Sequence, residues 1–252
     1  MLRGLTLALI LLSAPASAER WRAAYAITAA GITIMEADVT FRLGEDGGPY
    51  SIETRLRARG LAAFVLRGES LARSEGLWRG SLPRPWLHES GGNWRGTPRR
   101  TRLDYGADGN PRITTLMPSQ DMERAPLADG MLDGTVDSLS ALVGLIGQVR
   151  RTARCEARAR SFDGRRVTQF EVTTDPIVHA SDRGLLRCLV ESRPLAGYAL
   201  DRPVAEATRP TQSVLVFGVA LPGAPAIPVR IEVASRWWGT IQATLNELTS
   251  VD

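Results

Sequence analysis

The stretch "GTVDSLSALVGLIGQVRR", Gly134 to Arg151, breaks the pattern of the sequence around it. Its apolar residues recur every three or four positions, which predicts an amphipathic helix, whereas most of the remaining chain alternates with period two. Asp137 stands at the N-cap position, and Arg150 and Arg151 stand at the C-terminal end, where cations interact favourably with the helix dipole. The apolar face is interpreted as core, with a ligand-facing role as the alternative, and consists of Leu139, Leu142, Val143, Ile146 and Val149.

Two glycines, Gly144 and Gly147, interrupt this helix. Each costs about 1 kcal/mol relative to alanine in an exposed helix. We therefore expect a packing reason for both, such as close approach of the helix to a sheet.

Period-two alternation dominates on both sides of the helix. Upstream, "AAYAITAAGITIMEADVTFRL" predicts two strands joined at Ala29 to Gly31, and "PYSIETRLRARG" alternates apolar with charged residues, as in an antiparallel sheet with one solvated face. The region from Pro118 to Gly134 is rich in Pro, Asp and Gly and predicts a long surface loop. Downstream, Asp163-Gly164 predicts a hairpin turn, and further strands follow. The sequence therefore predicts a mainly β protein with one domain.

The N-terminus, "MLRGLTLALILLSAPASAER", has the features of a secretory signal peptide: Arg3, a short apolar run and a small-residue site ending at Ala18. A bilayer span needs about 20 apolar residues, more than this run contains. Glu19 is not a cysteine, so lipid attachment at the cut is not available. We expect residues 1–18 to be removed and residues 19–252 to form a single β-rich domain in the bacterial periplasm, with no transmembrane segment after cleavage.

The charge composition argues against nucleic acid as a partner. All 31 basic residues are arginine, and the formal net charge is only +4. Such an excess, spread along the chain, does not form a basic nucleic-acid footprint. The clusters "TPRRTR" and "RRTARCEARAR" could bind phosphate or carboxylate, but we interpret them as solvated faces interleaved with acidic residues.

The chain contains two cysteines, Cys155 and Cys188, separated by 33 positions. Because exported bacterial proteins fold in an oxidising compartment, we predict a disulfide that ties neighbouring strands together. Closing this loop should stabilise the fold by about 3 to 4 kcal/mol. A redox site would favour a Cys-x-x-Cys pair, and a zinc site would need two more ligands nearby.

Groups that could carry catalysis are scarce. His88 and His179 lie in no hydrolase or metal-binding motif and are expected to be surface or partly buried side chains. We therefore expect no catalytic activity, no cofactor and no metal, although two carboxylates facing each other across a cleft could still hydrolyse a glycan. Trp237 and Trp238 lie between two predicted strands and are candidates for contact with a ligand or with the core.

Three stretches, "DSLSALVGLI", "CEARARSFDGRRVTQFEV" and "CLVESRPLAGY", resemble the domain-of-unknown-function 3108 family of exported bacterial proteins. The likeness covers most of the chain from Tyr25 onward. The sequence departs from the family pattern at Leu185 to Arg187, where a stretch like Gly-Pro-Ala is expected. The matched positions are Asp137, Leu139, Ser140, Cys155, Phe162, Asp163, Gly164, Arg165, Arg166, Cys188, Gly197 and Tyr198.

The resemblance implies a strongly curved antiparallel sheet or open barrel packed around one α-helix, similar to periplasmic lipoprotein-carrier folds. A curved sheet must fill its interior with side chains or with a ligand. We therefore expect a monomeric, non-catalytic cell-envelope protein that binds a lipid or another apolar or amphipathic ligand in the concave face. The alternatives are a fully packed structural or interaction module with an envelope protein as partner, and an envelope glycan hydrolase.

Overall fold

A 13-stranded antiparallel sheet dominates the computed structural model, which describes residues 19–60, 63, 68–94, 96–119, 122–176, 184–235 and 239–251. The strand order within these residues is β7-β6-β5-β4-β3-β2-β1-β13-β12-β11-β10-β9-β8. The strands are β1 (Arg20–Ala29), β2 (Ile32–Leu43), β3 (Pro49–Ala58), β4 (Glu69–Arg79), β5 (Leu82–Trp94), β6 (Thr97–Tyr105), β7 (Pro111–Met117), β8 (Ala157–Phe162), β9 (Val167–Thr174), β10 (Leu186–Ala196), β11 (Thr211–Gly218), β12 (Ile227–Ser235) and β13 (Gly239–Val251).

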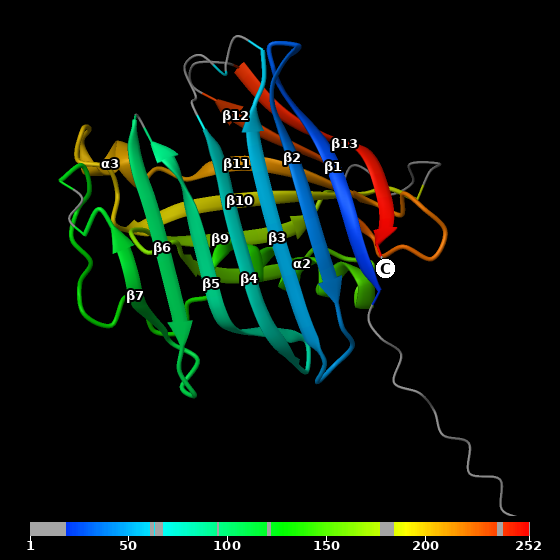
Figure 1. Cartoon of the computed structure of the whole chain (residues 1–252), viewed down its shortest axis with the longest axis horizontal. Coiled ribbons are helices and arrows are strands. Elements are labelled where there is room, and N and C mark those ends of the chain that lie inside the picture. The colour runs from blue at the N-terminus through cyan, green and yellow to red at the C-terminus, as the bar shows by residue number, and fades with distance from the viewer. Residues whose placement is uncertain are drawn as a thin grey trace, which may run out of the picture.

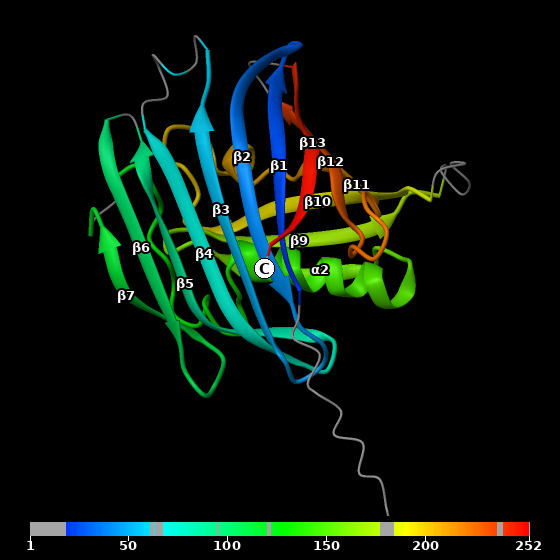
Figure 2. The same cartoon turned by 45° about the vertical axis from the view of Figure 1, so that its right-hand side comes forward.

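The chain crosses from one sheet edge, β7, to the other edge, β8, through the helix α2 (Ser138–Thr152), and later forms a short helix α3 (Val204–Ala207). The sheet curves strongly, so that its two halves face each other with α2 between them (Figures 1 and 2). The strands β7 and β8 do not pair with each other, so the sheet is not closed into a barrel. The predicted fold, a curved antiparallel sheet around one main helix, is confirmed.

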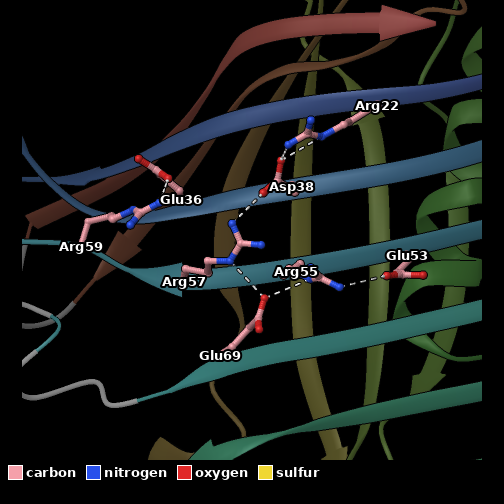
Figure 3. A network of polar contacts seen from close by, with 8 residues as sticks. All are labelled: Arg22, Glu36, Asp38, Glu53, Arg55, Arg57, Arg59 and Glu69. Atoms are coloured by element: carbon pink, nitrogen blue, oxygen red, sulfur yellow. Dashed lines mark hydrogen bonds and ion pairs between the residues drawn. The ribbon is translucent and has the colours of Figure 1, made fainter. Parts of the chain in front are cut away.

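Alternation along the strands separates an apolar inner face from a charged outer face. On β2, Ala37, Phe41 and Leu43 are buried in the core, while Glu36 and Asp38 lie on the opposite face. Figure 3 shows a chain of linked ion pairs across the outer face of β1 to β4, with the Arg59–Glu36 pair separate beside it. Exposed pairs of this kind contribute little to stability, so they chiefly keep this face solvated. The pairs are Arg22–Asp38, Arg57–Asp38, Arg57–Glu69, Arg55–Glu69, Arg55–Glu53 and Arg59–Glu36.

The main core lies between α2 and the concave face of the sheet. Val143 and Ile146 of the helix are 0% and 3% exposed, and they pack with side chains from both halves of the sheet. The helix begins where the sequence predicts, with Asp137 as N-cap, and it ends at Thr152 with Ala153 in the left-handed conformation. No helix in the described part of the chain is long and apolar enough to cross a bilayer.

The helix glycines have the packing reason that the sequence predicts. A Cβ on Gly147 would lie 2.5 Å from Cη2 of Trp78 on β4, and one on Gly144 would lie 3.2 Å from Cδ of Pro83 on β5. The Trp78 ring is held by Tyr50, at 5.9 Å between centroids, and by the Arg151 guanidinium at 5.8 Å. The absence of a side chain at Gly147 therefore lets α2 lie directly on the sheet.

A second, smaller apolar cluster joins the two halves of the sheet through side chains. Leu103 of β6 packs with Phe162, Val167 and Ala196 from β8, β9 and β10. Part of the region from Pro118 to Gly134, which the sequence predicts as a surface loop, adds to this contact. The described residues of this region form the predicted loop at the surface, and three of its side chains, Leu127, Met131 and Leu132, are partly buried against the same cluster.

The disulfide between Cys155 and Cys188 is confirmed, with a Cα–Cα distance of 5.7 Å and both residues fully buried. The sequence predicted that the bridge would tie neighbouring strands, and the structure contradicts this part of the prediction. Cys188 lies in β10 and Cys155 precedes β8, while β9 lies between these two strands. The prediction was wrong because Cys155 lies outside the strand, where its N–H donates to Thr174 Oγ1 at 3.0 Å. The bridge therefore anchors the segment that leaves α2.

Gly147→Ala should destabilise the protein by about 1 to 2 kcal/mol, because crowding against Trp78 exceeds the gain in helix propensity. Urea unfolding measures the change. Gly144→Ala is the matched control and should be closer to neutral, since only the Pro83 ring must shift by a few tenths of an ångström. Equal effects of the two substitutions would contradict the packing described here.

The double substitution Cys155→Ala, Cys188→Ala should lower the free energy of unfolding by about 3 to 4 kcal/mol, since it releases a loop of 33 residues. Chemical denaturation of the oxidised wild type and the variant tests this. Identical midpoints would show that the bridge adds nothing to stability.

Candidate functional site

A buried polar cluster holds the N-terminus of α2 against the sheet. It is built from Asp137 and Ser140 of the helix start, Ser74 of β4, His88 of β5 and Tyr50 of β3. Ser74, Asp137 and Ser140 are fully buried, and His88 is 5% exposed. Ser74 and His88 are direct partners in the register of β4 and β5, which places both side chains on the inner face.

The hydrogen bonds of this cluster converge on the Asp137 carboxylate. Oδ1 accepts from the Ser140 N–H at 2.9 Å and from the Ser74 hydroxyl at 2.5 Å, and Oδ2 accepts from the Ser140 hydroxyl at 2.6 Å. The hydroxyl protons of Ser74 and Ser140 are both donated to Asp137, so these two oxygens act as acceptors for their other neighbours. Tyr50 O–H therefore donates to Ser140 Oγ at 2.8 Å, and Nδ1–H of His88 donates to Ser74 Oγ at 2.8 Å. His88 Nδ1 also lies 3.3 Å from Asp137 Oδ1. The carboxylate is thus both the helix cap and the centre of a network that spans three strands.

This environment lowers the pKa of Asp137. Burial alone would raise the pKa of the carboxyl, but the hydrogen bond and charge interaction with His88 and the donors from Ser140 and Ser74 together outweigh burial. Burial also raises the pKa of Tyr50, so its phenol stays protonated and acts as a donor. The site therefore favours a permanently ionised carboxylate.

Serine, histidine and aspartate occur together here without forming a nucleophilic site. In a hydrolytic triad the histidine lies between the other two groups and takes the serine proton. Here the Ser74 hydroxyl donates directly to Asp137, and its side chain has no solvent access. The expectation that His88 is a surface or partly buried side chain is wrong, because strand pairing brings it to the inner face. His179 lies outside the described residues.

The inner face changes from buried to less completely buried along β3 and β12, whereas on β1 it stays buried as far as Ala29. On β3, Tyr50 and Ile52 are 1% and 2% exposed, whereas Leu56 is only partly buried. The helix lies against the buried end (Figure 2), with Ser140 bonded to Tyr50. At the other end, Val233 faces inward by its register with Ser213 and is 41% exposed. We call this end the open end; its inward apolar side chains are Ile27, Val39, Leu56, Ile231, Val233 and Leu245.

The residues predicted to face either the core or a ligand lie in or against the core wherever the structure describes them. Val143 and Ile146 are buried and form core, which leaves no surface for a ligand. Leu139 and Leu142 are partly buried and pack against the same core. Trp237 and Trp238 lie outside the described residues.

Several of the other matched positions lie around the hairpin turn between β8 and β9. Asp163 Oδ1 accepts from the N–H groups of Arg165 and Arg166 at 2.9 and 2.7 Å, so the hairpin turn predicted at Asp163-Gly164 is confirmed. Gly197, with φ +65°, lies directly on the Arg165 carbonyl, where any Cβ would clash. Tyr198 and Arg166 line a surface cavity of about 650 Å³. Only Asp137 and Ser140 of the matched residues belong to the buried polar cluster.

Several arginines of the two clusters form ion pairs with neighbouring acidic residues at the surface, in line with the predicted solvated faces. Arg102 contacts Glu89 at 2.6 Å, Arg154 contacts Glu156 at 3.1 Å, and Arg158 contacts Glu171 at 3.0 Å. In the described part of the chain, no three His, Cys, Asp or Glu side chains are grouped so that they could hold a metal ion.

Comparison with known proteins yields one structural likeness. The chain matches no protein-family model and no curated protein. A solved structure described as a β-barrel-like protein of domain of unknown function DUF1849, from Brucella abortus, superposes with a TM-score of 0.46 at 11% identity, covering 93% of this chain and 98% of that chain.

Asp137→Asn should lower the free energy of unfolding by about 2 to 4 kcal/mol at pH 7, because it removes the charge that the buried donors solvate. A lowered carboxyl pKa contributes stability that is complete above the usual aspartate value of about 3.9 and is lost as pH falls below it. The deficit of the variant should therefore shrink on acidification below about pH 4. Unfolding curves between pH 2.5 and 7 measure this, with Asp129→Asn in the exposed preceding loop as control. A deficit independent of pH would contradict the ionised network.

Proposed function

We propose that the chain is an exported, non-catalytic protein of the bacterial cell envelope that binds a lipid or another apolar ligand at the open end of its concave face. In this proposal residues 1–18 direct export and the mature protein acts in the periplasm. Membership of the domain-of-unknown-function 3108 family, whose fold resembles that of lipoprotein carriers, belongs to the same proposal.

The observation that carries the proposal is the change in burial along the inner face. Apolar side chains on the concave face of a curved sheet are normally fully buried. Leaving one exposed gives up about 1.5 to 3 kcal/mol of the hydrophobic free energy that its burial would contribute to folding. Leu56 is only partly buried and Val233 is 41% exposed, although both face the concavity. An apolar ligand at the open end would complete the burial that α2 provides at the other end. Incompletely buried apolar side chains inside a concavity are a feature of ligand sites.

The main alternative is a packed interaction module of the envelope. The buried half of the concave face and the second apolar cluster, both filled by side chains, are compatible with that alternative. The partial exposure along the open end favours the ligand-binding function. Glycan hydrolysis receives no support from Asp137, whose buried carboxylate is saturated with hydrogen bonds.

Leu56→Arg should weaken binding of an apolar fluorescent probe, 1-N-phenylnaphthylamine, by about tenfold or more, because a charge at the site must be desolvated when the probe binds. The matched control is Leu71→Arg on β4, which lies on the outer face opposite Arg55 and is 42% exposed in the wild type. Probe titration measures both variants, and circular dichroism checks that both are folded.

Native mass spectrometry and organic extraction of the purified wild type test the same proposal without a substitution. A lipid-sized adduct is expected. If no adduct is found and the probe does not bind, the ligand-binding proposal is refuted. If the Leu56→Arg and Leu71→Arg variants lose probe affinity equally, the probe binds at another site.

A further inference from the structure

A groove runs beside the free edge of β8, on a part of the molecule distinct from the open end. It has a volume of about 580 Å³. It is lined by the face of α2 that carries Ala141, Gly144 and Gln148 and by the start of β5, with Leu82 and Pro83, and α2 meets β5 where Gly144 packs on Pro83. The groove is also lined by residues 156–160, which lead into and form most of β8. The edge strand is therefore exposed inside a groove rather than on a flat surface.

The edge of β8 is only partly occupied by the protein's own chain. Val136 pairs with its far end in parallel: the Val136 N–H donates to Arg160 O at 3.0 Å, and the Phe162 N–H donates to Val136 O at 2.8 Å. Even-numbered residues of β8 therefore direct their backbone groups away from β9. The β8–β9 hairpin shows the same alternation: the odd-numbered Asp163 donates its N–H toward β9, to Arg166 O at 3.3 Å.

The same alternation identifies which backbone groups point into the groove. In a strand, the backbone N–H and C=O groups of successive residues point alternately to the strand on one side and to the strand on the other. The N–H and C=O of Arg158 and the N–H of Arg160 therefore face the free edge of β8. Val136 uses only the Arg160 carbonyl and the Phe162 N–H. Within the residues that the structure describes, two donors and one acceptor are thus available, at strand spacing, to an incoming chain. Such a row of edge groups is a template for addition of a strand.

The walls of the groove fit a polypeptide backbone. The inner-face side chains of β8 are Ala157 and Ala159, and Ala141 of the helix also lines the groove. These small side chains leave room for an extended chain and for its alternate side chains. Leu82, 64% exposed, provides an apolar contact at the rim.

The charge of the groove favours an acidic partner. Among the described residues that line it, Arg84, Arg151, Arg158 and Arg160 are basic and Glu156 is acidic, and Arg158 is paired with Glu171 beside the groove at 3.0 Å. Arg151 donates to the Ser81 carbonyl, and Arg160 donates to the Met131 and Asp133 carbonyls. These two guanidinium groups are therefore positioned by the backbone and can also attract carboxylates.

We propose that this groove binds an extended segment of a partner protein, which adds as a strand to β8 and carries small apolar side chains with at least one carboxylate. Main-chain hydrogen bonds to Arg158 and Arg160 give affinity, and the arginines select for acidic residues. This site does not depend on the apolar ligand of the open end.

The experiment selects binders from a phage-displayed library of random 12-residue peptides on the purified full chain, and measures the best synthetic peptide by calorimetry. Arg158→Pro removes the outward N–H without removing a bond of the β8–β9 ladder, so it should weaken binding at least tenfold. Arg158→Ala keeps that N–H and should retain affinity within about threefold, since an exposed charge contributes less than about 1 kcal/mol. Selected peptides should alternate in polarity and contain an acidic residue.

Hydrogen exchange on the wild type keeps the test independent of how well the proline variant folds. Peptide binding should protect the amides of Arg158 and Arg160 specifically. The proposal is overturned if no peptide is selected, if the proline variant binds as well as the wild type, or if protection falls on another edge. Self-association through β8 at the concentrations used, seen by sedimentation, would also overturn it in favour of a second copy as occupant.

Discussion

The structure depends on one buried carboxylate that fixes α2 inside the curve of the sheet. Asp137 caps the helix and at the same time accepts hydrogen bonds from a serine of β4 and a serine of the helix, with His88 of β5 beside them. Removing one partner from such a buried network leaves an unsatisfied charge, which costs far more than an exposed ion pair. The network therefore sets both the depth and the direction at which the helix enters, and Gly147 permits the close contact with Trp78 that follows.

The position of the helix determines which surfaces remain for function. With α2 covering one end of the concave face, the inward side chains at the open end, such as Leu56 and Val233, are left partly exposed. The disulfide from Cys155 to Cys188 anchors the chain where it leaves the helix. The start of β8 is thereby held beside α2 with a groove between them. The two proposed sites are thus consequences of the same helix placement, one in the interior and one at the edge.

Local features of the fold could be predicted from the sequence, and pairings between distant segments could not. The helix, its N-cap Asp137 and the turn at Asp163 follow from spacing within a few residues, and two cysteines allow only one intramolecular pairing. The role of His88 follows from its register with Ser74 on the next strand, which no local pattern encodes. The placement of β9 between the two cysteine-bearing segments could likewise not be predicted from the sequence, because it depends on the order of strands in the sheet. The partly exposed open end and the β8 groove arise from curvature, which the alternation of residues does not specify.

Native-state hydrogen exchange of α2 tests the central claim most directly, since it reports the free energy at which each segment opens. If the Asp137 network makes the helix part of the core, the amides of Val143 and Ile146 should exchange only by global unfolding, with the same free energy and denaturant dependence as the slowest amides of β1 and β2. If those helix amides instead exchange through a local opening several kcal/mol below the global free energy, α2 is a loosely held insert, and the buried carboxylate does not organise the fold.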